Sequence, residues 1–202
     1  MTKERWKNLM ANSGLSSSIE CYESLCKSYS EKHRHYHTTE HINAMLRHLD
    51  EVIDLSENPY ELELAIWFHD AIYKPFSSTN ELDSAEWSKE FLLANNYDQA
   101  GVERVYSLIM ATLHDVNVDK TDEKLIVDID LSILGTPAHV YDEFEKNIRK
   151  EYKLVPWMIY RKKRKAILES FLSLDSIYHF DFFKDKFEQA ARENINRAVS
   201  QL

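Results

Sequence analysis

The sequence predicts an all-α protein, and two observations support that fold class. Apolar residues recur three or four positions apart along most of the chain, which is the periodicity of amphipathic helices. Only 3 glycines and 4 prolines occur in 202 residues, so the chain has few of the obligatory turns that a sheet with tight hairpins needs. We therefore expect one domain of about eight to ten helices, because this length is enough to enclose a hydrophobic core.

The first half of the chain contains the helices that we expect to form the core. Those within residues 1–30 pack on that core, and the clearest of them covers 17–31. Residues 38–56 form the next helix, opened by two threonines that can cap its N-terminus. Pro59 suits the first turn of the following helix, which continues to Ile72. The middle of that helix, LAIWFHDAIY, is apolar on nearly all sides, so we expect it to be central and buried.

The rest of the chain continues the helical pattern. Residues 74–79 are expected to form a loop, and Asn80 is expected to cap a helix that reaches about Leu93. No repeat, low-complexity tract or linker interrupts the order, so residues 1–202 are predicted to be a single domain. Further helices are expected at about 98–114, 125–134, 137–152, 157–173 and 183–200, the last within a C-terminal segment at 175–202, with a polar loop at 117–122.

Composition and charge narrow the functional classes. The net charge of −9 argues against a nucleic-acid polymer as partner, because such binding requires a basic face. A small anionic substrate is compatible with this charge, since a metal ion and a few cations can reverse the local field. The two cysteines, Cys21 and Cys26, cannot make a disulfide framework, which favours a cytoplasmic location. The chain start lacks the apolar region of a signal peptide, and no stretch approaches 18 apolar residues, so no membrane partner is expected.

Two short motifs carry most of the chemistry. The first, YHTTEH, contains His37 and His41 four residues apart, a spacing that puts both on one face of a helix. The second is the adjacent pair His69-Asp70, whose side chains on a helix would diverge by about 100° and could still reach one metal cluster. A carboxylate on this apolar helix would be costly if unpaired, and a metal ion is one way to satisfy it. The alternative is a His–Asp pair that bonds to the backbone or to an arginine.

A third motif, Asp128-Ile129-Asp130, follows about sixty residues after Asp70. Imidazole and carboxylate together suit a divalent transition metal, so Mn, Fe, Co, Ni or Zn would fit this ligand set better than Mg alone. The sequence therefore predicts a metal site with one or two ions, assembled from separate helices.

The HTTEH segment also matches H-x-x-E-H, the inverted zinc-protease pattern. In that alternative His37 and His41 would hold zinc and Glu40 would be the general base. It leaves the His69-Asp70 pair without a role, and it needs a substrate-binding sheet that this sequence does not predict.

The order His41, His69-Asp70 and Asp130 resembles the HD superfamily of metal-dependent phosphohydrolases. More specifically, YHTTEHI, AIWFHDAIY, NELDSAEWS, DIDLSILG, IRKEY and ARENINRAV resemble the small bacterial proteins described as predicted metal-dependent HD phosphohydrolases, over about residues 34–198. This resemblance implies an HD-type helical bundle in which His41, His69, Asp70 and Asp130 bind the metal.

The resemblance also suggests different roles within each motif. YHTTEHI is similar to the YHNxxH segment of cyclic-nucleotide phosphodiesterases, in which the first histidine is the proton donor and the second is the ligand. It therefore implies His37 as general acid and His41 as ligand. The Leu-Ser that follows Asp130 resembles the ADLS segment of phosphodiesterases, which favours Asp130 over Asp128 as ligand. Asp128 would then be a cap, a partner of a ligand or a surface charge.

Several other residues are candidates for contact with a phosphorylated substrate. Arg161 and Arg164, three apart in the run RKKRK, could reach phosphate from one helix face, although such runs are also typical of solvated surfaces. His114 could hold a second metal or contact phosphate, and its alternative is a helix-terminal histidine near the negative end of the dipole. The remaining candidates are Arg149 and two tyrosines that could stack on a nucleobase, Tyr36 and Tyr73, while the resemblance alone places Glu40, Asn80 and Glu81 near the pocket.

Together these features predict a metal-dependent phosphohydrolase for a phosphate ester of a nucleotide or another small phosphorylated metabolite. The metal would bind phosphate oxygens and activate a water that attacks phosphorus. Asp70 would help to orient or deprotonate that water, and His37 would protonate the leaving oxygen. The alternative from another class is a non-catalytic protein that senses a nucleotide in the same helical bundle. Monoesterase or diesterase activity, and a monomer or homodimer, are both open at this point.

Overall fold

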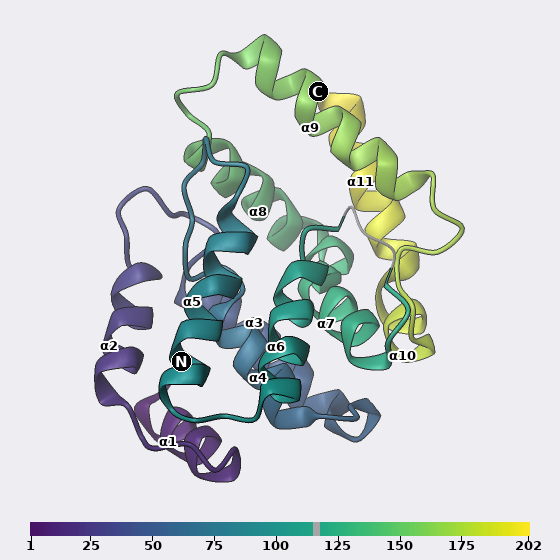
Figure 1. Cartoon of the computed structure of the whole chain (residues 1–202). Coiled ribbons are helices and arrows are strands. Elements are labelled where there is room, and N and C mark those ends of the chain that lie inside the picture. The colour runs from purple at the N-terminus through teal and green to yellow at the C-terminus, as the bar shows by residue number, and fades with distance from the viewer. Residues whose placement is uncertain (115–117) are drawn as a thin grey trace. The chain divides into compact units, whose positions relative to one another are not determined.

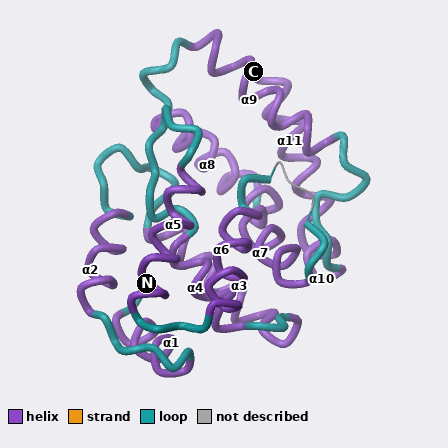
Figure 2. The backbone as a smooth tube through the Cα atoms, in the orientation of Figure 1, coloured by secondary structure: helices purple, strands orange, loops and turns teal. Residues whose placement is uncertain are grey.

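Helices form all of the regular secondary structure in residues 1–114 and 118–202, the parts of the chain that the computed structural model describes (Figure 1). No strand occurs among these residues (Figure 2), and the predicted all-α fold is confirmed. No described helix is both long and apolar enough to cross a membrane. The chain divides into a first unit, Met1–Val127, and a second unit, Asp128–Leu202, so the single domain stays a prediction.

The first unit begins with two helices, α1 (Lys3–Asn12) and α2 (Ile19–Ser28). Trp6 of α1 is fully buried, and its ring lies 5.1 Å from that of Trp67 in an edge-to-face arrangement. Its indole N–H donates to the carbonyl of Ser18 at 3.0 Å, so the same side chain fixes the start of α2. These contacts place the N-terminal helices against the core, as the sequence predicts.

The helix α4 (Pro59–Phe68) is buried along most of its length, as its apolar sequence predicts. Its first residue is a proline, which suits a position where the backbone N–H has no partner within the helix. The carboxylates of Glu61 and Glu63 are buried too, and each is paired with a guanidinium, from Arg104 and Arg5 respectively. The helix contacts α1, α3 (Thr39–Val52), α5 (Asn80–Ala94) and α6 (Gln99–Ala111).

The end of α4 differs from the sequence-based expectation. The expected helix included His69 and Asp70, but α4 ends at Phe68 and the pair lies in the turn that follows. The N–H of Ala71 donates to the carbonyl of Phe68 at 2.8 Å, which closes this turn. The carbonyls of Asp70 and Ala71 accept from the guanidinium of Arg34, a tertiary partner that the helical periodicity does not reveal.

The loop at 74–79 forms as expected, but Asn80 does not cap α5. Its side-chain oxygen accepts from the N–H of Lys74 at 2.9 Å, and its side-chain nitrogen donates to the Lys74 carbonyl at 3.1 Å. The cap position belongs to Thr79. Asn80 is buried and uses both its groups to close the loop, which explains why its side chain is not available for capping.

The helix α7 (Thr121–Leu131) begins in the first unit and ends in the second. Near its start, the buried carboxylate of Asp122 accepts from the Ser56 hydroxyl and the Asn58 N–H, both at 2.8 Å. The beginning of α7 is thereby fixed to the segment that precedes α4. The first residue of the polar loop expected at 117–122 lies outside the described residues.

The second unit contains the other expected helices. Their bounds lie within a few residues of the expected ones, because strong apolar periodicity defines these segments well. A π-helical turn, Lys184–Glu188, interrupts the helical pattern that the sequence predicts as one helix at 183–200. The helices are α8 (Ala138–Glu151), α9 (Trp157–Leu172), the short α10 (Asp181–Phe183) and α11 (Gln189–Gln201).

Two carboxylates hold the segment that precedes α10. Glu188, in the π-helical turn, and Asp128, fully buried on α7, each accept from two consecutive main-chain N–H groups. Asp128 is therefore a buried hydrogen-bond acceptor and not a surface charge. Burial raises its pKa to about 7, although the N–H groups that it accepts from oppose this shift. The four N–H groups belong to Ile177, Tyr178, His179 and Phe180.

Candidate metal centre

Three of the predicted ligands converge within the first unit. His41 lies in the first turn of α3, and His69 and Asp70 lie in the turn after α4. The two Nε2 atoms are 3.2 Å apart, and Oδ2 of Asp70 lies 3.1 Å from Nε2 of His69 and 3.7 Å from Nε2 of His41. Ligand atoms that each bind one transition-metal ion at about 2.1 Å are separated by about 3 to 3.4 Å. The spacing of these three atoms is close to that requirement, and all three side chains are buried.

The ring of His69 is oriented by a main-chain carbonyl. Its Nδ1 lies 3.0 Å from the carbonyl oxygen of Ile66, which can only accept a hydrogen bond. Nδ1 therefore carries a proton. In the neutral ring the lone pair lies on Nε2, the atom that faces His41 and Asp70, and in the protonated ring the Nε2–H group donates to Asp70 instead. A hydrogen bond from Nδ1 to a carbonyl is what metal-binding histidines commonly use to fix their tautomer.

Asp70 is held in its ionised form. Burial alone would raise the pKa of its carboxyl group, but the charges of His69, His37 and His41 and a hydrogen bond from His69 hold that pKa well below its usual range. An ionised carboxylate is the form that binds a metal ion. The buried charge thus requires cations or polar hydrogens around it, and the three histidines supply them.

Arg34 supports the turn that carries Asp70. Its side chain is fully buried, and it donates to the main-chain carbonyls of Asp70 at 2.6 Å, Ala71 at 3.0 Å and His37 at 3.3 Å. One guanidinium thereby joins the segment before α3 to the turn after α4. No motif singled out Arg34 in the sequence, where its only distinction is its place three residues before His37. The guanidinium lies over the rings of Tyr29 and Tyr73, at 5.2 and 5.4 Å.

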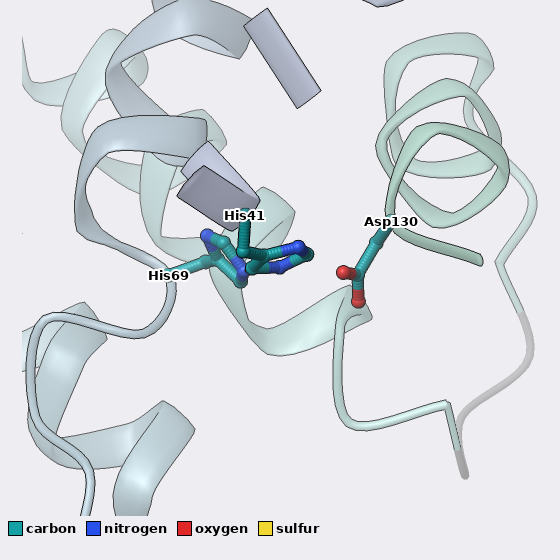
Figure 3. Close-up of side chains that lie close together, drawn as sticks. All are labelled: His41, His69 and Asp130. Atoms are coloured by element: carbon teal, nitrogen blue, oxygen red, sulfur yellow. The ribbon is translucent and has the colours of Figure 1, made fainter. Parts of the chain in front are cut away.

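The fourth predicted ligand, Asp130, lies near the end of α7, the helix whose start is fixed by Asp122. His41, His69 and Asp130 each offer one ligand atom, and these atoms lie within 4.8 Å of one another (Figure 3). The described residues therefore include a group of side chains that could hold a metal ion.

The aromatic candidates pack on the histidines. The ring of His37, the expected general acid, stacks on that of Tyr73 at 4.2 Å and lies 6.2 Å from the ring of His41. The ring of Tyr36 lies 4.8 Å from that of His41 and 5.0 Å from that of His37. His37 is thus held beside the ligand cluster, between two aromatic rings. Stacking of either tyrosine on a nucleobase stays a prediction.

The HTTEH segment does not have the geometry that its spacing predicts. The helix α3 begins at Thr39, so His37 precedes the helix and does not share a helical face with His41. The cause is Thr38, which occupies the cap position and accepts from the N–H of Glu40 through its hydroxyl. No strand occurs in the described parts of the chain to supply the sheet that the zinc-protease alternative needs.

Two further candidates are Glu81 and His114. The pKa of Glu81, in the first turn of α5, is raised by burial and by the charge of Asp70, while His69 and His114 act in the opposite direction. This mutual influence places Glu81 near the ligand cluster, where the resemblance expects it. His114 lies beyond the end of α6 at Ala111 and has a φ of 58°, so it is not the helix-terminal residue that the sequence pattern predicts. Such backbone conformations in non-glycine residues are often found at functional sites.

The three arginines expected to contact phosphate lie in the second unit and differ in environment. Arg164 is largely buried, and its guanidinium forms two hydrogen bonds with Glu145, at 3.1 and 2.5 Å. Arg149 lies with its guanidinium 4.8 Å from the ring of Tyr160. Arg161 is exposed to solvent. Their contact with a phosphate group stays a prediction, and for Arg164 it would compete with an existing ion pair.

Comparison with known proteins does not add a relative. No protein-family model, curated protein or solved structure matches this chain. Its function is therefore proposed from the chemistry of the side chains, and the HD-superfamily resemblance contributes to that proposal through its motifs alone.

Proposed function

We propose that this protein is a metal-dependent phosphohydrolase acting on a phosphate ester of a nucleotide or another small phosphorylated metabolite. The observation that carries the proposal is the convergence of two imidazole nitrogens and one ionised carboxylate, of His41, His69 and Asp70, within 3.7 Å of one another. A buried hydrogen-bonded pair needs only one histidine for one carboxylate. A second imidazole nitrogen, 3.2 Å from the first and 3.7 Å from the carboxylate, gives the three-donor arrangement that a shared cation requires.

The proposed ligands are His41, His69, Asp70 and Asp130. Their mixed nitrogen and oxygen donors favour Mn, Fe, Co, Ni or Zn over Mg alone. A bound ion of this kind supplies a positive charge for phosphate oxygens and lowers the pKa of a coordinated water toward neutrality. Protein side chains then have two tasks, which are to orient the phosphate ester and to move protons.

His37 is the proposed general acid. Its position beside His41 and against the ring of Tyr73 limits its motion, and a histidine is suited to donating a proton near neutral pH. Arg34 takes no part in the proton transfer. Its guanidinium donates to the main-chain carbonyl of His37 and so helps to position His37. In the proposed reaction His37 donates its proton to the oxygen that leaves phosphorus. Glu81 is under the electrostatic influence of the ligands, and in the proposed reaction its carboxylate accepts the proton that the attacking water loses.

The test combines metal analysis with a hydrolysis screen. Wild-type protein and the variants His69→Ala, Asp70→Ala and His37→Gln are analysed for bound metal, then assayed on nucleotides, phosphomonoesters and phosphodiesters with added Mn, Co, Ni, Zn or Mg. The ligand variants should lose metal and activity together. His37→Gln should keep metal and lose about 10²–10⁴-fold in kcat, the usual contribution of a general acid.

Matched controls are available on exposed positions. His139→Ala and Asp54→Asn change the same residue types at solvent-exposed sites and should keep both metal and activity. Circular dichroism of every variant separates loss of metal from loss of fold. The site assignment is wrong if His69→Ala and Asp70→Ala stay folded with full metal content. Tight nucleotide binding with no product in any metal would show a sensor instead of a hydrolase.

A further inference from the structure

An exposed apolar cluster lies around the turn that joins α8 to α9, in the second unit. Four large apolar side chains within six consecutive residues, 154–159, are exposed to solvent. Single exposed apolar residues are ordinary on protein surfaces, but a cluster of this kind marks an interaction surface. The exposed fractions are 75% for Leu154, 48% for Trp157, 69% for Met158 and 51% for Ile159.

Three consecutive cations follow this cluster, Arg161, Lys162 and Lys163. All three are exposed, and in the described parts of the chain none of them forms an ion pair. The two basic residues that come next differ, because Arg164 pairs with Glu145 and Lys165 lies 3.9 Å from Glu169. The chain as a whole has a net charge of −9, so this unpaired positive charge is a local exception.

The helical geometry of α9 puts two apolar and two basic side chains on one face. Met158 and Lys162 are four residues apart, and so are Ile159 and Lys163, which places each pair one above the other on the helix. The opposite face is the packed one. The buried residues Tyr160 and Leu168 lie opposite to these four side chains. We call the four, together with the exposed Leu154, Trp157 and Arg161 that flank them, the apolar–basic face.

We propose that the apolar–basic face binds the surface of a lipid bilayer that contains anionic phospholipids. The cations would contact headgroup phosphates, and the apolar side chains would enter the boundary between headgroups and acyl chains. Tryptophan is enriched at this boundary, and lysine stems can lie along apolar groups while their ammonium groups stay in water. The proposal concerns peripheral binding, which needs no membrane-spanning helix and is independent of the proposed hydrolase activity.

The chemistry of the face favours a bilayer over other anionic partners. A nucleic acid would use the cations but would leave Leu154 and Met158 without a role. Exposed fractions of 75% and 69% show that these side chains project into solvent, whereas side chains that line a preformed groove for a protein are partly shielded. A deformable lipid surface accommodates projecting side chains without a complementary pocket.

The test measures co-sedimentation of the full-length protein with vesicles of phosphatidylcholine alone or with about one third phosphatidylglycerol. Binding should require the anionic lipid and weaken as salt is raised. Each basic residue near such a surface contributes about fivefold to binding, so Lys162→Glu with Lys163→Glu should weaken binding at least about 25-fold. Trp157→Ser with Met158→Ser, compared with wild type, should weaken vesicle binding about tenfold or more. This loss should not depend on salt, because it removes apolar contacts and no charge.

A matched control reverses two charges elsewhere. Lys3→Glu with Lys7→Glu makes the same change in net charge on exposed positions of α1 and should leave most of the binding intact. Tryptophan emission should shift to shorter wavelength when anionic vesicles are added, and Trp157→Phe should abolish the shift while keeping the binding. Circular dichroism confirms that each variant is folded.

Three outcomes would overturn the proposal. The first is equal sedimentation with zwitterionic and anionic vesicles, or none with either. The second is equal loss of binding in the α1 control and in the α9 variants, which would indicate only a general effect of net charge. The third is a dimer in sedimentation-velocity experiments that Trp157→Ser with Met158→Ser dissociates, which would show that a second copy of the chain covers this face.

Discussion

At the scale of single residues, Arg34 joins the two segments that carry the candidate metal ligands and the proposed general acid. It is fully buried and donates to three carbonyls, two of them in the turn that carries Asp70. Hydrogen bonds from a charged group to buried main-chain acceptors are among the stronger ones in proteins, and loss of the donor leaves the acceptors unpaired. The geometry of the ligands should therefore change when this guanidinium is removed.

Arg34→Met should lower the free energy of unfolding by about 2–4 kcal/mol and weaken metal binding by about 10–100-fold. Arg34→Lys keeps the charge but lacks the planar fork, so it should be intermediate in both measurements. Urea denaturation and metal titration by calorimetry check the two effects separately. The exposed Arg47→Met on α3 is the matched control. Unchanged metal affinity in a folded Arg34→Met variant would contradict the proposal that Arg34 positions the ligands.

The sequence allows the ligand candidates to be chosen, but not the residues that support them. His41, His69 and Asp70 were selected because their types and order suit a metal, and they do converge. Arg34 could not be selected, because the groups through which it holds the ligand-bearing segments are main-chain carbonyls, which every residue type carries. The same reason hides the role of Asp128, which accepts from backbone N–H groups fifty residues away.

At the scale of elements, the periodic pattern locates helices well and their ends less well. Within the described residues, each long helix occurs close to its expected place. The differences from expectation concern helix ends and caps. The helix α4 ends at Phe68, before His69, and the Asn80 side chain bonds to the main chain of Lys74 instead of capping α5. Periodicity reports which face of a helix is apolar, whereas an end depends on which tertiary partner takes the free carbonyl or N–H groups.

The π-helical turn provides a test at this scale. Burial alone would raise the pKa of Glu188, but hydrogen bonds from the N–H groups of Ile177 and Tyr178 and from Arg192 lower it below its ordinary value of 4.5. The stability that the charged form contributes is thus present above about pH 4.5 and is lost as the pH falls toward the folded-state pKa.

Glu188→Gln should therefore destabilise the protein by about 1–2 kcal/mol at pH 7, because the charged acceptor is replaced by a neutral one. The difference from wild type should shrink as the pH is lowered below the ordinary value of 4.5, where wild-type Glu188 itself becomes protonated. Urea denaturation across this pH range is the measurement, with the exposed Glu193→Gln on α11 as control. A pH-independent difference would contradict the assigned role of the charge.

At the scale of the whole molecule, folding and metal binding should be linked. A ligand that binds only the folded chain stabilises it by about 2.7 kcal/mol at one hundred times its dissociation constant. Removal of metal with a chelator should therefore lower the melting temperature of the wild-type protein and leave that of His69→Ala unchanged. An equal shift in both proteins would mean that the stabilising metal is bound at another site.

The early end of α4 has a consequence for transplanting this site into another protein. In a helix that continued past Phe68, the carbonyl of Ile66 would face the N–H of Asp70. Because the helix stops, that carbonyl accepts from Nδ1 of His69 instead and leaves the lone pair on Nε2. A designer who copied the side chains onto an uninterrupted helix would obtain the correct residues with an unfixed imidazole tautomer. A transplanted site would therefore need the end of the helix after Phe68 as well as the histidine.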